Sequence, residues 1–320
     1  MYQEFFGLRE DPFRVNPDPR YLFLTPSTQE ALTSLAYGIR CRYGIIVMSG
    51  EVGTGKTTLL HALLDGLRQI RAATAFIFNP RLSVEGLIAA VMSDFGITCN
   101  THEKHEALAV LNRWLLDRYH AGQVTVLIID EAQHLSADAL EEIRLLTNLE
   151  TSTEKLLQIV LSGQPELEEK LRYTQLRQLR QRITIRCRTT PLSMEETQGY
   201  VMKRLQIAGA NGQPIFSPEA LEGIHAYSFG IPRVINLLCQ HALIQAFADQ
   251  MRPVSAAHVA EVARDFELDN ANWLISEKYA RVGQSQGWDA SREILCEAGL
   301  TSHQIHPTQV LEETQHEPHP

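Results

Sequence analysis

The sequence predicts an α/β fold in which a parallel sheet carries helices on both faces and is followed by a small all-α domain. Apolar runs typical of strands lie near residues 44–49, 74–78, 124–129, 157–162 and 183–187. Helical periodicity occurs between them, near residues 57–69, 83–95, 104–120, 136–149 and 165–180. Alternation of this kind is typical of a parallel sheet covered on both faces. After Pro191 the strand-like runs stop and only helical stretches follow.

The first strand-like run leads into a glycine-rich loop. The pattern G-x-x-x-x-G-K-[ST], the Walker A motif, is matched here by Gly50, Glu51, Val52, Gly53, Thr54, Gly55, Lys56 and Thr57, with Thr58 continuing into a helical stretch. Glycines let the backbone curl around phosphates, and the positive end of the next helix faces the anion. We expect Lys56 to reach the β- and γ-phosphates and the Thr57 hydroxyl to ligate Mg²⁺.

The third strand-like run ends in two adjacent carboxylates, Asp130 and Glu131. Asp130 is placed to hold the water shell of the metal, and Glu131 can polarise the attacking water as a general base. A whole strand–helix–helix stretch separates the loop from this pair, which indicates the ASCE branch of P-loop NTPases, with an additional strand and a catalytic glutamate. No guanine-specific Asn-Lys-x-Asp segment occurs, so we expect ATP rather than GTP, bound with Mg²⁺ and hydrolysed.

Composition is typical of an intracellular enzyme. The chain has 320 residues, 44% of them hydrophobic and 21% charged, which is enough for a full core and two domains. No apolar run approaches the roughly 18–20 residues that cross a bilayer, and no secretory signal begins the chain, so we expect a cytoplasmic protein. Five scattered cysteines are expected to be reduced thiols: Cys41, Cys99, Cys187, Cys239 and Cys296.

The net charge of −9 is uneven along the chain. Residues 264–320 hold ten acidic and four basic side chains, so the body is close to balanced and a nucleic-acid surface on it is not excluded. The chain divides into four expected segments. An N-terminal extended segment and helix (1–43) pack on the ATPase core, the core spans 44–190, a helical lid spans 191–270, and an acidic flexible tail spans 271–320.

Expected helix starts follow capping signals. Ser27 with Glu30 predicts a capping box that opens a helix to about Arg42. In the lid, helix starts are predicted at Ser193, at Ser217-Pro218, at Gly230–Arg233 and at Ser255.

Several short motifs occur in a characteristic order. They are FGL (6–8), DPF (11–13), the Walker A loop, IDEAQ (129–133), LLTNLE (145–150), SGQPEL (162–167), LRQRI (179–183) and GIPRVIN (230–236). Over residues 1–265 this order resembles the ExeA/GspA family, AAA+ ATPases named for the general secretion pathway. Near relatives of that family are ATPases of exopolysaccharide loci and TniB- and MuB-like transposition regulators. The resemblance implies an ASCE-type AAA+ ATPase sheet followed by a helical lid.

The resemblance also implies roles for single residues. Ser162 or Gln164 matches the sensor-1 region, where a polar group contacts the γ-phosphate or the catalytic water. Asn79 matches a position that restrains the catalytic glutamate, with a turn-forming role before Pro80 as an equal alternative. Arg233 resembles the sensor-2 arginine that brings the lid onto the nucleotide.

Two arginines are candidates for a finger that acts on the ATP of a neighbouring subunit. They are Arg180 and Arg182, of which Arg182 is preferred. An arginine suits this role because its guanidinium matches the spread charge of phosphoryl transfer. The alternative is that the arginines of residues 172–188 form a solvated face. A finger implies a homo-oligomer with sites between subunits. Tyr21 either lines the adenine pocket or serves as a hydrophobic anchor.

Secretion-pathway members of the family carry a membrane span and a periplasmic peptidoglycan-binding portion after the ATPase module. This sequence shows neither, so we expect a membrane-protein partner that recruits the chain to the inner face of the membrane. Three functions stay open. The favoured one is an oligomeric ATPase for secretion or envelope assembly. The second is a transposition-regulator-type ATPase that binds duplex DNA through residues 172–188 and lid helices. The third is a non-catalytic nucleotide switch, against which intact Lys56, Asp130 and Glu131 argue.

Overall fold

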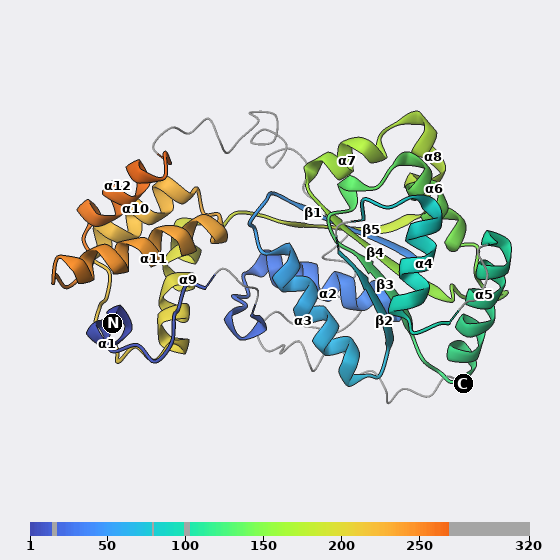
Figure 1. Cartoon of the computed structure of the whole chain (residues 1–320), viewed down its shortest axis with the longest axis horizontal. Coiled ribbons are helices and arrows are strands. Elements are labelled where there is room, and N and C mark those ends of the chain that lie inside the picture. The colour runs from blue at the N-terminus through green and yellow to red at the C-terminus, as the bar shows by residue number, and fades with distance from the viewer. Residues whose placement is uncertain (15–17, 79, 99–102, 269–320) are drawn as a thin grey trace. The chain divides into compact units, whose positions relative to one another are not determined.

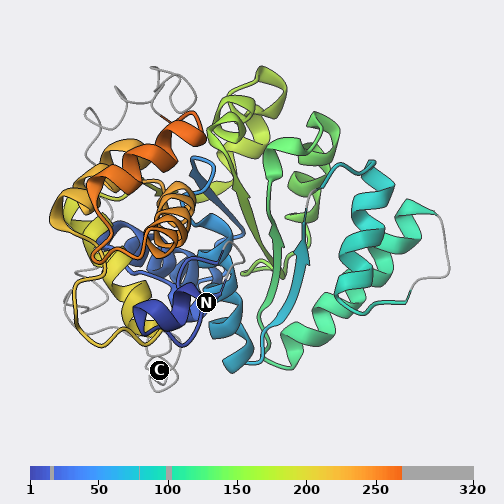
Figure 2. The same cartoon turned by 60° about the vertical axis from the view of Figure 1, so that its left-hand side comes forward.

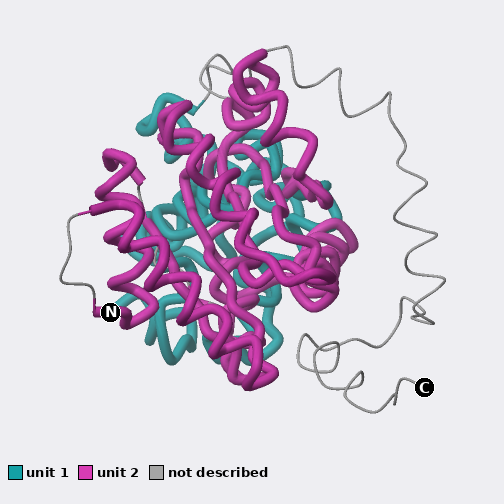
Figure 3. The backbone as a smooth tube through the Cα atoms, turned by 90° about the vertical axis from the view of Figure 1, so that its right-hand side faces the viewer, with its two compact units in different colours: residues 1–16, 192–306 teal, residues 17–191, 307–320 magenta. Residues whose placement is uncertain are grey.

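The computed structural model of the chain describes residues 1–14, 18–78, 80–98 and 103–268, drawn as ribbons in Figure 1. These residues fall into two compact units, which are residues 18–191 and residues 1–14 together with 192–268 (Figure 3). The expected tail at 271–320 lies outside the described residues, as do Asn79, Cys99 and Cys296.

The first unit is built on a five-stranded parallel sheet. Its strands are β1 (Ile45–Gly50), β2 (Ala73–Ile77), β3 (Thr125–Ile129), β4 (Leu157–Gly163) and β5 (Ile183–Thr189). Their order across the sheet is β2-β3-β4-β1-β5. Strand β4 therefore lies between the strand that leads to the glycine-rich loop and the strand that ends before Asp130. This order confirms the predicted parallel sheet with an additional strand.

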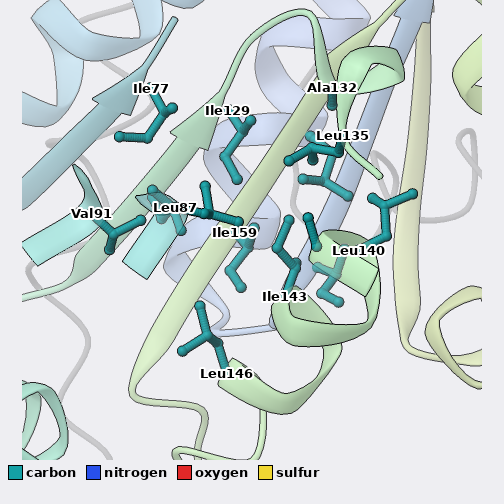
Figure 4. Close-up of a cluster of buried hydrophobic side chains, with 14 of the residues drawn as sticks. Ile77, Leu87, Val91, Ile129, Ala132, Leu135, Leu140, Ile143, Leu146 and Ile159 are labelled. Atoms are coloured by element: carbon teal, nitrogen blue, oxygen red, sulfur yellow. The ribbon is translucent and has the colours of Figure 1, made fainter. Parts of the chain in front are cut away.

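Helices cover both faces of the sheet (Figures 1 and 2). The helices α2 (Pro26–Arg40) and α3 (Lys56–Gln69) pack on one face, and the other face carries α4 (Val84–Asp94), α5 (Lys104–His120) and α6 (Ala137–Leu146). Alternate strand residues supply the two cores: Ile46 and Met48 join the α2–α3 side, whereas Ile45 and Val47 join the α4–α6 side. Figure 4 shows Ile129 and Ile159 of the sheet in the same buried cluster as Leu140, Ile143 and Leu146 of α6. Burial on both faces explains why the strands read as continuous apolar runs.

The strand register brings the chemistry-bearing segments to one edge of the sheet. Met48 of β1 pairs with Ser162 of β4, and Gly50 pairs with Thr189 of β5. On the other side of β4, Ile129 of β3 pairs with Leu161. Because the strands are parallel, the segments that follow β1, β3 and β4 leave the sheet at its carboxyl edge, where open α/β sheets place their ligand sites.

The expected helix over residues 165–180 is broken. The structure has α7 (Pro165–Leu171), a 3-10 turn (η3, Thr174–Leu176) and α8 (Arg177–Gln181). Four leucines of this stretch are buried: Leu167, Leu171, Leu176 and Leu179. In one straight helix Leu176 would face away from Leu167, since a step of nine positions amounts to about two and a half turns. The break turns all four toward the core.

Helix α2 begins earlier than expected. Its N-cap is Thr25, whose hydroxyl accepts a hydrogen bond from the Thr28 backbone N–H, while the Thr28 side chain returns a bond to the Thr25 backbone. Pro26 occupies the first helical position, which suits its fixed φ and missing N–H. The predicted capping box at Ser27 and Glu30 was therefore wrong by two residues.

The second unit consists mainly of helices. They are α9 (Met194–Ile207), α10 (Pro218–Ser228), α11 (Pro232–Ala248) and α12 (Ala256–Asp265). The predicted starts at Ser193, Ser217 and Ser255 are confirmed as N-caps, and Pro232 opens α11. Helix α11 supplies the centre of the unit, with Ile235, Leu238 and Cys239 fully buried. Within the described ranges, no helix has the length and apolar character required to cross a membrane.

The first 14 residues belong to this helical unit, whereas the sequence analysis placed them on the ATPase core. They begin with a short helix, α1 (Tyr2–Phe6). The Phe5 ring packs edge-on against Phe247 at 5.5 Å between centroids, and the buried Phe13 packs in the same way against Phe216 at 6.2 Å. Arg204 donates a hydrogen bond to the Pro12 carbonyl. These aromatic and polar contacts with α9, α11 and the α9–α10 connection explain the assignment.

The helical unit yields a stability prediction at Gly230. This glycine has a φ of 74°, and a Cβ added to it would lie 2.0 Å from the Leu192 carbonyl oxygen. Gly230→Ala should lower the free energy of unfolding by about 3 kcal/mol or more, from left-handed strain plus overpacking. Gly212→Ala is the matched control, because Gly212 has a φ of 82° with open space around it, and should cost only about 1 kcal/mol. Denaturant unfolding of the full chain measures both, and equal losses would contradict the clash.

Candidate active site

The residues after β1 form a tight loop that ends in the first turn of α3. Gly53 and Gly55 have φ values of 81° and 94°, which side-chain-bearing residues rarely adopt. A Cβ on Gly55 would meet no atom within 4 Å, so the space in front of this residue is open. Lys56 Nζ donates to the carbonyls of Gly50 at 2.7 Å and Glu51 at 2.9 Å. A curled glycine loop at a helix N-terminus, with a buried lysine, fits a polyphosphate.

The end of β5 supports the loop from behind. Thr54 Oγ1 lies 2.7 Å from Thr189 Oγ1 and donates to the Glu51 carbonyl at 2.8 Å. A Cβ on Gly50 would lie 2.0 Å from Thr189 Oγ1. Gly50 therefore permits the close approach of β5, besides opening the loop. The sequence analysis did not single out Thr189, because a threonine that ends a strand carries no distinguishing signal.

Asp130 is the centre of the hydrogen-bond network at the end of β3. The residue is buried, and its carboxylate accepts from Thr57 Oγ1 at 2.8 Å, Ser162 Oγ at 2.8 Å and the Glu131 backbone N–H at 3.0 Å. Three hydrogen-bond donors thus converge on one carboxylate. The Thr57 hydroxyl and the Asp130 carboxylate thus form an adjacent pair of hard oxygen donors, the ligand type that Mg²⁺ prefers. The donor set fits the expected metal.

Glu131 follows with a left-handed backbone, at a φ of 54°. Its Oε2 accepts hydrogen bonds from Gln133 Nε2 and, at 3.2 Å, from Gln164 Nε2. Burial alone would raise the pKa of Glu131, but the two amide bonds and the charge of Lys56 outweigh burial and hold the pKa below its ordinary value. The group is therefore a carboxylate at neutral pH and can accept a proton.

Lys56 experiences the opposite balance of forces. Burial lowers the pKa of its ammonium, and the negative charges of Glu131 and Asp130 oppose that effect only in part. Its ammonium group donates to two carbonyls and lies near two carboxylates, so it places a positive charge at the carboxyl edge of the sheet. It lies where the loop turns into α3, as expected for a phosphate-contacting lysine.

Ser162 and Gln164, the two sensor-1 candidates, both reach the carboxylate pair. Ser162 is fully buried and donates to Asp130, whereas Gln164 donates to Glu131. The two side chains therefore serve different carboxylates. Sequence alone left the choice open because it gives no information on which carboxylate each one reaches.

The two finger candidates differ in their contacts. Arg182 Nη1 donates to Thr147 Oγ1 and Asn148 Oδ1, each at 2.6 Å, and so binds the segment at the C-terminal end of α6. A cation is favourable there because it faces the negative end of the helix dipole. Arg180 is exposed, and no hydrogen bond or ion pair of its side chain occurs within the described ranges.

The remaining predicted residues lie elsewhere. Tyr21 is buried in a 3-10 turn (η1, Pro19–Tyr21) that packs beside α3. Arg233 is exposed in the first turn of α11, in the helical unit. Within the arginine-rich stretch, Arg186 forms an ion pair with Glu168. Its exposed members are Arg172, Arg177, Arg180 and Arg188.

The sequence of the chain is similar to those of known proteins. The profile described as "AAA domain" matches residues 40–171. General secretion pathway protein A of Aeromonas hydrophila is 48% identical over 294 residues, which cover 90% of this chain and 53% of that protein. The chain contains an AAA domain. It is related to general secretion pathway protein A, as the motif order predicts, and spans about half the length of that relative.

Solved AAA+ structures confirm the fold class. The Drosophila ORC bound to DNA matches with a TM-score of 0.64 and 18% identity, over 95% of this chain and 80% of that one. Cdc6p from Pyrobaculum aerophilum matches with a TM-score of 0.63 and 18% identity, over 81% and 71% of the two chains. At these identities the likeness concerns the fold, an ATPase sheet followed by helices.

Proposed function

We propose that the chain binds ATP with Mg²⁺ and hydrolyses it. The observation that carries the proposal is the paired arrangement at the end of β3. Asp130 accepts a hydrogen bond from Thr57, the residue that follows the loop lysine. The neighbouring Glu131 accepts hydrogen bonds from the amides of Gln133 and Gln164, which stabilise its carboxylate form. A non-catalytic nucleotide switch needs no second carboxylate oriented in this way.

Each residue has a chemical task in this proposal. The backbone of the loop and Lys56 hold the phosphates, while Thr57 and Asp130 hold Mg²⁺, which when bound neutralises charge on the β- and γ-phosphate oxygens. Glu131 takes a proton from the attacking water. Ser162 orients Asp130, and Gln164 orients Glu131 and would contact the γ-phosphate or the catalytic water as the sensor-1 residue. The proposal also keeps three expected roles: restraint of the catalytic glutamate by Asn79, lining of the adenine pocket by Tyr21, and contact of the lid with the nucleotide through Arg233.

The active form in this proposal is a homo-oligomer whose sites are completed by an arginine of the neighbouring subunit. Arg180 is the better candidate, since it is exposed and Arg182 is engaged at the end of α6. The ATPase would act in the cytoplasm and serve secretion or envelope assembly, recruited to the membrane by a membrane-protein partner. The identity to general secretion pathway protein A over 90% of this chain supports this setting.

A second candidate function is ATP-dependent DNA association of the transposition-regulator type. The observation that favours it is the group of exposed arginines on the segment from α7 to β5: Arg172, Arg177, Arg180 and Arg188. Side chains of this kind suit duplex phosphates, and such binding would weaken steeply with added salt.

The loop lysine provides the first test of the proposal. Lys56→Ala should weaken ATP binding about 10- to 100-fold, because it removes a charge-assisted contact to phosphate. Titration of a fluorescent ATP analogue measures the affinity. The matched control is Lys203→Ala, at an exposed lysine of the helical unit, which should bind like the wild type. Wild-type affinity in Lys56→Ala would remove the loop from the nucleotide site.

The second carboxylate separates binding from chemistry. Glu131→Gln should bind ATP with near wild-type affinity yet turn it over about 10²-fold or more slowly, since the amide cannot act as the base. Phosphate release at saturating ATP measures turnover, and Glu106→Gln, at an exposed position of α5, is the control. Turnover unchanged by Glu131→Gln would exclude Glu131 as the base.

Mixing of inactive variants tests catalysis between subunits. Arg180→Ala and Glu131→Gln proteins, each inactive alone, should regain ATP turnover when mixed, because one interface then combines an intact base with an intact arginine. Arg182→Ala is tested in parallel and should also lower thermal stability through loss of its contacts with Thr147 and Asn148. If neither arginine variant recovers in oligomers shown to be mixed, the intersubunit finger is wrong.

A further inference from the structure

Gln133, one of the two glutamines whose amides reach Glu131, joins two parts of the proposed catalytic machinery. Its side chain is 9% exposed. Its Nε2 donates to Glu131 Oε2, and its Oε1 accepts the backbone N–H of Gln164 at 3.1 Å. One side chain therefore connects the carboxylate after β3 with the residue that follows β4.

The surroundings hold Gln133 in this place. Lys170 Nζ donates to the carbonyls of Gln133 and, at 2.8 Å, of Leu135, which fixes the backbone of the short turn after Glu131. A Cβ on Gly163 would lie 2.8 Å from Gln133 Oε1 and 2.9 Å from Leu167 Cδ2. Gly163 thus leaves the room that the Gln133 amide occupies.

These contacts settle which way the amide faces. Because Oε1 accepts a backbone N–H, the Nε2 end must face Glu131, and an N–H donor there suits an ionised carboxylate. Gln164 Nε2 donates to the same carboxylate oxygen, Oε2. In the part of the chain that the structure describes, no hydrogen bond reaches Glu131 Oε1. The two oxygens of Glu131 are therefore not equivalent.

We propose that Gln133 is a positioning residue for hydrolysis, whose amide holds Glu131 Oε2 so that Oε1 receives the proton of the attacking water. The inference rests on the proposed function of Glu131 as the base. In the step it serves, the water oxygen bonds to the γ-phosphorus, the bond to the β-phosphate oxygen breaks, and its electron pair leaves with ADP. Glu131 Oε1 takes the proton and later returns it to phosphate or solvent.

Gln133→Glu tests this role with a small change of shape. The new carboxylate can still accept the Gln164 N–H, but it cannot donate to Glu131 and adds a negative charge beside it. We expect kcat to fall about tenfold or more. The acid limb of the kcat–pH profile should move to higher pH, because a nearby like charge raises the pKa of Glu131. ATP affinity should stay within about twofold, since phosphate contacts are unchanged.

Two further variants complete the experiment. Gln133→Met keeps the length of the side chain, loses both hydrogen bonds and should lower kcat with a smaller shift of the acid limb. Gln206→Glu introduces the same charge at an exposed position of α9 and should behave like the wild type. ATP affinity and thermal stability verify that each variant is folded.

The outcomes distinguish this inference from the proposed function. A wild-type kcat and pH profile in both Gln133 variants would overturn the positioning role. So would a fall in kcat that is matched by an equal loss of ATP affinity with no movement of the acid limb. If the wild type releases no phosphate, or Glu131→Gln retains full turnover, it is the proposed function that fails.

Discussion

The carboxylate of Asp130 is the group on which the arrangement of the candidate site depends. A buried charge is costly unless hydrogen bonds replace its water, and here the donors come from three directions: Thr57 in α3, Ser162 in β4 and the backbone of Glu131. Helix α3, strand β4 and the turn that carries Glu131 are thereby fixed to one another. The same bonds place Glu131 where Gln133 and Gln164 can hold its side chain.

Much of this could be predicted from the sequence because it depends on local patterns. Strands that are buried on both faces have unbroken apolar sequences, and the glycine-rich loop has a sequence motif that is specific for a phosphate-binding loop. The break at Leu171–Leu176 was missed because the helical period fails only over that one step. Thr189 was missed because its partner Thr54 lies far away along the chain, and only the pairing of β1 with β5 brings the two together. Gln133 was missed because its second partner, the backbone N–H of Gln164, belongs to the segment after another strand, which the sequence alone does not place beside it.

The arginines after α7 show how a sequence pattern can combine separate roles. Arg182 and Arg186 bind groups within their own unit, at the end of α6 and at Glu168. Arg180 is exposed and remains available to another molecule. This exposure is the reason that we propose Arg180 as the finger, whereas the sequence analysis preferred Arg182. The exposed arginines proposed for DNA binding are Arg172, Arg177, Arg180 and Arg188. The DNA-binding and intersubunit proposals therefore share Arg180.

The most direct test of the account is phosphate release from ATP by the full chain with Mg²⁺, measured per protomer over a range of protein concentrations. The account predicts Mg²⁺-dependent hydrolysis whose specific rate rises with protein concentration, because each site needs an arginine from a neighbour. Nucleotide binding without phosphate release at any concentration would contradict it, and would assign the paired carboxylates to a switch rather than to an ATPase.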